Sequence, residues 1–121
     1  MCVADGVGGW REYGIDPRLY AYTLVEHAKK SILDVKQTGQ ADVIIAEAWE
    51  STAQTCIETE KIIESGLSGP DVRKIQGSST LCVATIDLDK MQLEYSNIGD
   101  SGLMVLRHIG VDRVGYLRDV C

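Results

Sequence analysis

The hydrophobic pattern of this chain changes its period near Gly77, and that change limits the folds that the chain can adopt. Before Gly77 the apolar residues recur mainly at helical spacing, whereas after it they alternate or form short β-favouring runs. An apolar run that ends at Asp5 adds one strand ahead of the helices. Elements grouped by kind along a chain are typical of an α+β fold. We therefore predict two long antiparallel helices packed on antiparallel strands.

Two helices are predicted before Gly77. The first covers about 17–36, because Asp16 can cap free N–H groups and Pro17 suits the first helical position. The second covers about 42–65, where Gly66 can take the left-handed conformation that closes a helix. The predicted inner face of the first helix comprises Tyr20, Leu24, Ala28 and Ile32, with Leu33 and Val35 beside them, and that of the second comprises Ile45, Trp49, Thr52, Ala53, Cys56, Glu60 and Ile63.

At least three successive strands are predicted after a loop at 67–76. They cover 81–86, 91–96 and 103–106, with turns at 87–90 and 97–102, and the pattern at 111–116 also permits a strand.

Composition excludes several classes of partner. The 121 residues suit one domain, and 12 basic against 18 acidic residues give a net charge of −6 without any run of lysine or arginine. We therefore expect no nucleic-acid partner and no membrane partner. No targeting segment and no long apolar span is visible. The scattered cysteines and histidines lack metal-ligand spacing and indicate structural or exposed roles for Cys56, Cys82, His27 and His108.

In the segment CVADGVGGW at 2–10, a short apolar run is followed directly by one carboxylate and then by three closely spaced glycines. Asp5 offers the hard oxygen ligands that Mg²⁺ or Mn²⁺ prefer. The glycines let the backbone approach an ion or a phosphate closely. The same Asp-Gly pair is also typical of an ordinary turn, so the residues alone leave both interpretations open.

Three segments in order, VADGVGGW at 3–10, GSSTLCVATID at 77–87 and SNIGDSGLMVLR at 96–107, resemble the metal-dependent protein serine/threonine phosphatases of the 2C type. The resemblance covers nearly the whole chain. It implies an α-β-β-α sandwich, of which residues 1–121 would form the N-terminal half. It also implies a phosphoprotein substrate, hydrolysed by a metal-activated water without a phosphoenzyme.

The resemblance also implies metal-binding residues, with two Mg²⁺ or Mn²⁺ ions and a possible third. The Asp5 carboxylate would bridge two ions, and the Gly6 carbonyl would reach one of them. Asp100 matches the family aspartate near a further, weaker position, although its surroundings would also suit a plain turn. The segment 77–80 matches one with a mainly structural role. Trp10 and Arg11 could shape a substrate rim, but a packed tryptophan and a solvated arginine are the commoner pattern.

Val7 stands where many family members have a histidine that protonates the leaving oxygen. Valine cannot transfer a proton, so another residue or a water would have to do so. The sequence DGVGGW is most similar to a branch of the family found in mitochondria and plastids. That branch suggests a mitochondrial or plastid location, with the cytoplasm as the alternative.

The family draws further metal ligands from segments that this chain lacks. Only four residues precede Asp5, and Asp112 and Asp119 lie in the wrong contexts to replace the late aspartates. The chain is therefore expected to be a fragment that is inactive alone, and no catalytic residue beyond the metal ligands is assigned. A phosphatase-like binding module without catalysis is the alternative. A nucleotide-phosphate cradle ranks last, because neither G-x-G-x-x-G nor a Walker lysine is present.

Overall fold

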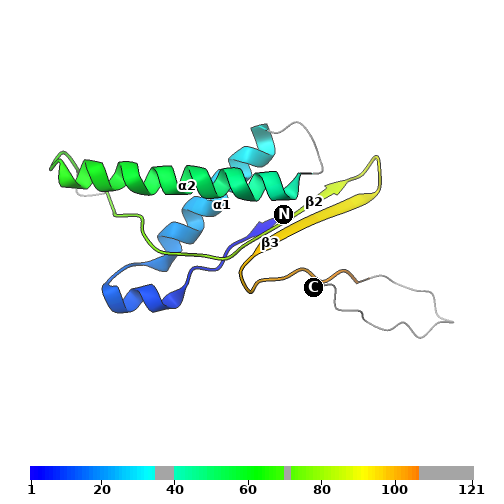
Figure 1. Cartoon of the computed structure of the whole chain (residues 1–121), viewed down its shortest axis with the longest axis horizontal. Coiled ribbons are helices and arrows are strands. Elements are labelled where there is room, and N and C mark those ends of the chain that lie inside the picture. Colours follow the sequence, from blue (N-terminus) through cyan, green and yellow to red (C-terminus); the bar gives the residue numbers. More distant parts are fainter. Residues whose placement is uncertain (35–39, 70–71, 107–121) are drawn as a thin grey trace.

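Two long helices lie over a three-stranded antiparallel sheet in the computed structural model, which describes residues 1–34, 40–69 and 72–106 (Figure 1). The elements in order are β1 (Cys2–Val3), the 3-10 helix η1 (Gly8–Tyr13), α1 (Pro17–Asp34), α2 (Ala41–Glu64), β2 (Leu81–Asp87) and β3 (Gln92–Ile98). The strand order is β1-β2-β3. One helix layer on one sheet layer confirms the predicted α+β class and is consistent with half of an α-β-β-α sandwich.

The start of α1 is capped as the sequence predicts. The Arg18 backbone N–H donates to Asp16 Oδ1 at 3.1 Å, and the Leu19 N–H donates to the Asp16 backbone oxygen at 3.2 Å. Pro17 occupies the first helical position, where a missing N–H breaks no helical hydrogen bond. The predicted continuation of this helix to 36 lies outside the described residues.

The predicted end of α2 is also confirmed. Gly66 has a left-handed φ of 69°, and its N–H donates to the Ile63 carbonyl at 3.1 Å. This bond, and that from the Ser65 N–H to the Lys61 carbonyl at 3.0 Å, satisfy carbonyls that the last helical turn would otherwise leave free.

The core joins α1, α2 and β2. Small residues, among them Ala28 and Ala48, lie fully buried where the helices meet and let the two backbones approach closely. The buried side chains of this cluster are Tyr20, Leu24, Ala28, Ala41, Ile44, Ile45, Ala48, Leu81 and Val83.

The predicted inner face of α2 is wrong in part. Trp49 is 43% exposed, and Ala53 and Glu60 are exposed as well. The buried row instead runs through Ala41, Ile44, Ile45, Ala48 and Thr52. Trp49 and Ala53 each follow a buried residue by one position, which rotates them by about 100° around the helix axis and away from α1 and the sheet.

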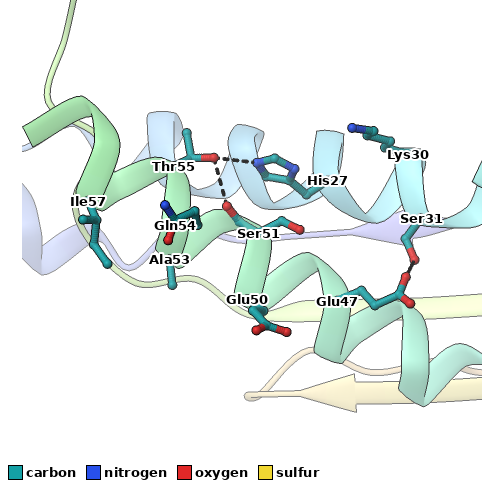
Figure 2. Close-up of a pocket in the computed structure, with 10 residues that line it drawn as sticks. All are labelled: His27, Lys30, Ser31, Glu47, Glu50, Ser51, Ala53, Gln54, Thr55 and Ile57. Atoms are coloured by element: carbon teal, nitrogen blue, oxygen red, sulfur yellow. Dashed lines mark hydrogen bonds between the residues drawn. The ribbon is translucent and has the colours of Figure 1, made fainter. Parts of the chain in front are cut away.

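A polar seam runs beside this core, between α1 and α2 (Figure 2). His27 Nε2 lies 3.0 Å from Thr55 Oγ1, and the Ser31 hydroxyl donates to Glu47 Oε2. Because the Thr55 hydroxyl donates to the Ser51 carbonyl at 2.9 Å, the proton of the His27 contact must come from Nε2. His27 therefore ties the two helices together, whereas His108 lies outside the described residues.

Strands β2 and β3 form the predicted hairpin. Asp87 Oδ1 accepts the N–H groups of Asp89 and Lys90, both at 3.0 Å, and so closes the turn. Strand β3 covers 92–98, slightly later than the predicted 91–96. Its face away from the helices carries exposed apolar side chains, with Leu93 paired to Ile86 and Tyr95 paired to Ala84.

The predicted strand at 103–106 does not form, and 111–116 lies outside the described residues. A strand needs a hydrogen-bonding partner along its length, and within the described part of the chain nothing pairs with 103–106. In the residues that the structure describes, two successive strands therefore follow the helices instead of the three predicted. None of the helices described here is sufficiently long and apolar to span a membrane.

Replacing Leu24 by alanine should lower the free energy of unfolding by about 2–5 kcal/mol, because this side chain is fully buried between the helices. Urea denaturation followed by circular dichroism measures the change. Leu33 on the same helix is 74% exposed, so Leu33→Ala should stay within about 0.5 kcal/mol. Equal losses in the two variants would contradict the described orientation of α1.

The carboxyl of Asp16 should titrate with a midpoint of about pH 2, because the Arg18 side chain lowers its pKa from 3.8. A lowered pKa in the folded state means that the stabilisation is complete above 3.8 and is lost as the pH falls toward about 2. Carboxyl-carbon NMR shifts measure the midpoint. Arg18→Gln should raise it toward 3.8, whereas Arg73→Gln should not move it; an unchanged midpoint in Arg18→Gln would disprove the pairing.

Candidate metal centre

The backbone of Asp5 is held by three hydrogen bonds to the segment that precedes β2. The Asp5 N–H donates to Thr80 Oγ1 at 3.1 Å, and the Asp5 carbonyl accepts from the Thr80 N–H and from Ser79 Oγ, both at 3.0 Å. These bonds occupy both backbone polar groups of Asp5. The exposed carboxylate makes no hydrogen bond or ion pair with any residue that the structure describes and is accessible to solvent or to a ligand.

Gly6 lies against the first turn of α1 and leaves no space for a side chain. A Cβ atom at this position would lie 2.5 Å from the Pro17 carbonyl oxygen, which is shorter than any tolerable contact. The Val7 N–H donates to the Ser78 carbonyl at 3.0 Å and holds the next residue on the same segment. The loop that carries Asp5 is therefore fixed between α1 and the segment before β2.

Trp10 anchors the far end of this loop. Its indole Nε1 donates to Ser78 Oγ at 2.9 Å, and the half-buried ring lies beside Gly77, whose φ is 138°. A side chain at Gly77 would be strained by that backbone conformation. Within this segment Trp10 therefore packs, whereas the following Arg11 is exposed.

The turn that contains Asp100 packs against Thr80, the same residue that binds the Asp5 backbone. Thr80 Oγ1 lies 2.8 Å from Ser101 Oγ, and Gly99 has a φ of 100°. A Cβ atom at Gly99 would lie 2.7 Å from Thr80 Cγ2, so only glycine allows this approach. Asp100 itself is exposed. One hydroxyl group thus contacts both the Asp5 backbone and the residue next to Asp100.

The three residues predicted as metal ligands, Asp5, Gly6 and Asp100, therefore lie on segments that contact Ser79 or Thr80, just before β2. Exposed carboxylates and a backbone carbonyl are the hard oxygen donors that Mg²⁺ and Mn²⁺ prefer, so the chemistry of the donor set fits these ions. In the part of the chain that the structure describes, no three His, Cys, Asp or Glu side chains come together as a metal site. The oxygen atoms of these residues could supply only part of a coordination shell for such an ion. Asp112 and Asp119 lie outside the described residues.

Sequence reasoning missed how much the hydroxyls of Ser79 and Thr80 contribute. It assigned 77–80 a structural role because small side chains allow close packing of the sheet. Both residues are buried, and their hydroxyls hold the loop of Asp5 through hydrogen bonds. Two adjacent hydroxyl residues directly before an apolar strand were the available signal.

Thr80→Val should lower the free energy of unfolding by about 1–3 kcal/mol, because the Asp5 N–H loses its acceptor while the shape of the side chain is kept. Thr85 provides a matched control, since its buried hydroxyl has no partner among the described residues. Thr85→Val should therefore be neutral or stabilising. Chemical denaturation of the three proteins measures both effects, and an equal response of the two valine variants would refute the role given to Thr80.

Comparison with known proteins finds relatives of this chain among protein phosphatases. The chain is 30% identical over 106 residues to the protein phosphatase PTC7 homolog of Danio rerio and 30% identical over 105 residues to that of Homo sapiens, in each case over 87% of its length. It is 35% identical over 108 residues, or 89% of its length, to the protein phosphatase PTC7 homolog fig of Drosophila mojavensis.

The chain spans 30% of the length of each of these relatives. No protein-family model and no solved structure matches it. Over most of its own length the chain is thus a relative of protein phosphatases named PTC7 homolog, which supports the phosphatase family that its three motifs resemble.

Proposed function

We propose that this chain is the N-terminal part of a metal-dependent protein serine/threonine phosphatase domain of the 2C type. The observation that carries the proposal is that the backbone of Asp5 is held in place while its carboxylate is exposed. Its N–H and carbonyl are held by Ser79 and Thr80, while its exposed carboxylate has no partner among the described residues. Because this backbone is already fixed, little further conformational entropy is lost when the carboxylate binds an ion. The similarity to protein phosphatases over 87% of the chain supports the same reading.

The residues have distinct roles in this proposal. Asp5 would hold two Mg²⁺ or Mn²⁺ ions, Gly6 would offer its carbonyl to one of them, and Asp100 would serve a weaker, third position. When bound, such ions supply an activated water and neutralise charge on the phosphoryl group of a phosphoserine or phosphothreonine. Thr80 orients the site by holding Asp5 and the turn of Asp100 at once.

Leaving-group protonation does not come from Val7. This side chain is 47% exposed in the loop that carries Asp5, and it carries no titratable proton. In the proposed mechanism the proton comes from water or from another part of the protein. The DGVGGW sequence also supports, by resemblance alone, a mitochondrial or plastid location for the phosphatase.

The remaining metal ligands are proposed to come from parts of the protein beyond this chain. Two carboxylates in the described residues would hold a pair of divalent ions weakly, since such ions usually take six or more oxygen ligands. We therefore expect weak ion binding and no significant hydrolysis by the chain alone.

A binding module without catalysis is the second candidate, favoured by Val7 and by the small number of carboxylates. It predicts no ion site that depends on Asp5. The two candidates therefore differ in whether the Mn²⁺ affinity of this chain depends on Asp5, and that affinity can be measured directly.

Asp5→Asn should weaken Mn²⁺ binding by about tenfold or more in a calorimetric titration, because it removes the charge of the central ligand. Asp89, exposed in the β2–β3 turn, provides the control of equal charge change, and Asp89→Asn should leave the affinity unchanged. Equal Mn²⁺ affinity in the parent chain and in Asp5→Asn would favour the binding module.

In a longer natural chain, Asp5→Asn should abolish Mn²⁺-dependent hydrolysis of p-nitrophenyl phosphate, whereas Asp89→Asn should retain it. Circular dichroism of each variant checks that the fold is intact. Hydrolysis that survives Asp5→Asn would overturn the assignment of this residue.

A further inference from the structure

A shallow depression of about 470 Å³ lies between η1 and the start of α1. Arg11, Gly14, Ile15, Asp16 and Arg18 line it. It is separate from the seam between α1 and α2, and neither Asp5 nor Asp100 lines it.

The backbone gives this depression a defined shape. Gly14 has a left-handed φ of 73°, and its N–H donates to the Arg11 carbonyl at 3.0 Å. The Ile15 N–H donates to the Trp10 carbonyl at 3.2 Å. These bonds turn the chain back after η1, so that Asp16 and Arg18 line the same depression as Arg11.

The depression carries one positive charge in excess. Arg18 forms two close contacts with Asp16, Nε to Oδ1 at 3.0 Å and Nη2 to Oδ2 at 2.8 Å, which neutralise one guanidinium. The Arg18 side chain lowers the pKa of Asp16 to about 2, so the pair is fully ionised at neutral pH. Arg11 makes no ion pair within the described residues, and Glu12 does not line the depression. Arg11 feels the Asp16 carboxylate only at longer range. An arginine without a close ion pair, in a depression of net positive charge, is suited to an external anion.

The depression is rigidly joined to the loop that carries Asp5. Gly6 lies against the Pro17 carbonyl at the start of α1, and the Trp10 indole is bonded to Ser78 on the segment that also holds Asp5. In Figure 1, η1 and the start of α1 lie side by side at the lower left, and the chain connects them to β1 beside β2. An anion in the depression therefore keeps a fixed position relative to Asp5.

We propose that Arg11 binds an anionic side chain of the phosphoprotein substrate, a carboxylate or a second phosphate, beside the residue that is dephosphorylated. The inference rests on the proposed function, because the neighbouring loop is taken to hold the reacting phosphate. The planar fork of a guanidinium matches the two oxygens of a carboxylate or phosphate. Arg11 thereby becomes a specificity-determining residue that favours acidic sequences around the phosphorylated site.

Peptide titration of the isotope-labelled chain tests this inference. Three phosphoserine peptides are compared: one flanked by glutamates, one flanked by glutamines, and one flanked by further phosphoserines. The Trp10 indole and Gly14 amide NMR signals report binding. We expect the glutamate peptide to bind about two- to fivefold tighter than the glutamine peptide at low salt, the range of an exposed ion pair. Tighter binding of the phosphoserine-flanked peptide would identify a second phosphate as the preferred anion.

Arg11→Gln should remove the preference for acidic flanks, whereas Arg73→Gln, a change at an exposed arginine on the loop before β2, should retain it. Arg11→Lys keeps the charge without the fork and should retain part of the preference. Unshifted amide signals elsewhere show that the variants are folded. Absence of any preference, or a preference that survives Arg11→Gln, would overturn the inference.

The two proposals fail in different ways. If Mn²⁺ does not bind at Asp5 but the preference for acidic peptides remains, the phosphatase assignment fails. Arg11 then still forms a site for acidic peptides. An Asp5-dependent Mn²⁺ site without any acidic preference would remove only the role of Arg11.

Discussion

The hydroxyl of Thr80 is the contact on which the arrangement around Asp5 depends. It accepts the Asp5 N–H at 3.1 Å and lies 2.8 Å from Ser101 Oγ, so one buried group holds two segments that are far apart in sequence. Ser79 adds a second hydroxyl on the Asp5 carbonyl. With the backbone occupied in this way, the carboxylate of Asp5 is the polar group that remains for a ligand.

The helix layer supports this contact from the other side. Leu24, Ala48 and Val83 are fully buried and join both helices to β2, which fixes the strand that begins just after Thr80. Gly6 in turn packs on the first turn of α1. Because close-packed contacts leave little freedom, the loop of Asp5, the turn of Asp100 and the depression at Arg11 share one rigid frame.

Two features of the described residues fit the proposal that this unit is part of a larger domain. The outer face of the sheet exposes apolar side chains such as Ile86, Leu93 and Tyr95, which a second layer would cover in a sandwich. Within the described residues, no three His, Cys, Asp or Glu side chains come together near Asp5. Both observations agree with a chain that spans 30% of the length of its relatives.

The sequence by itself determined the local structure: the capped start of α1 at Asp16, the end of α2 at Gly66, the β2–β3 hairpin and the α+β class. Each depends on neighbouring residues, so periodicity and turn chemistry reveal it. The same reasoning placed Trp49 inside and a strand at 103–106, because a pattern cannot show which face a neighbour covers or whether a partner strand exists. Only the tertiary structure brought Asp5, Thr80 and Ser101 together, since hydrogen bonds between such distant residues form only after the helices and strands have packed.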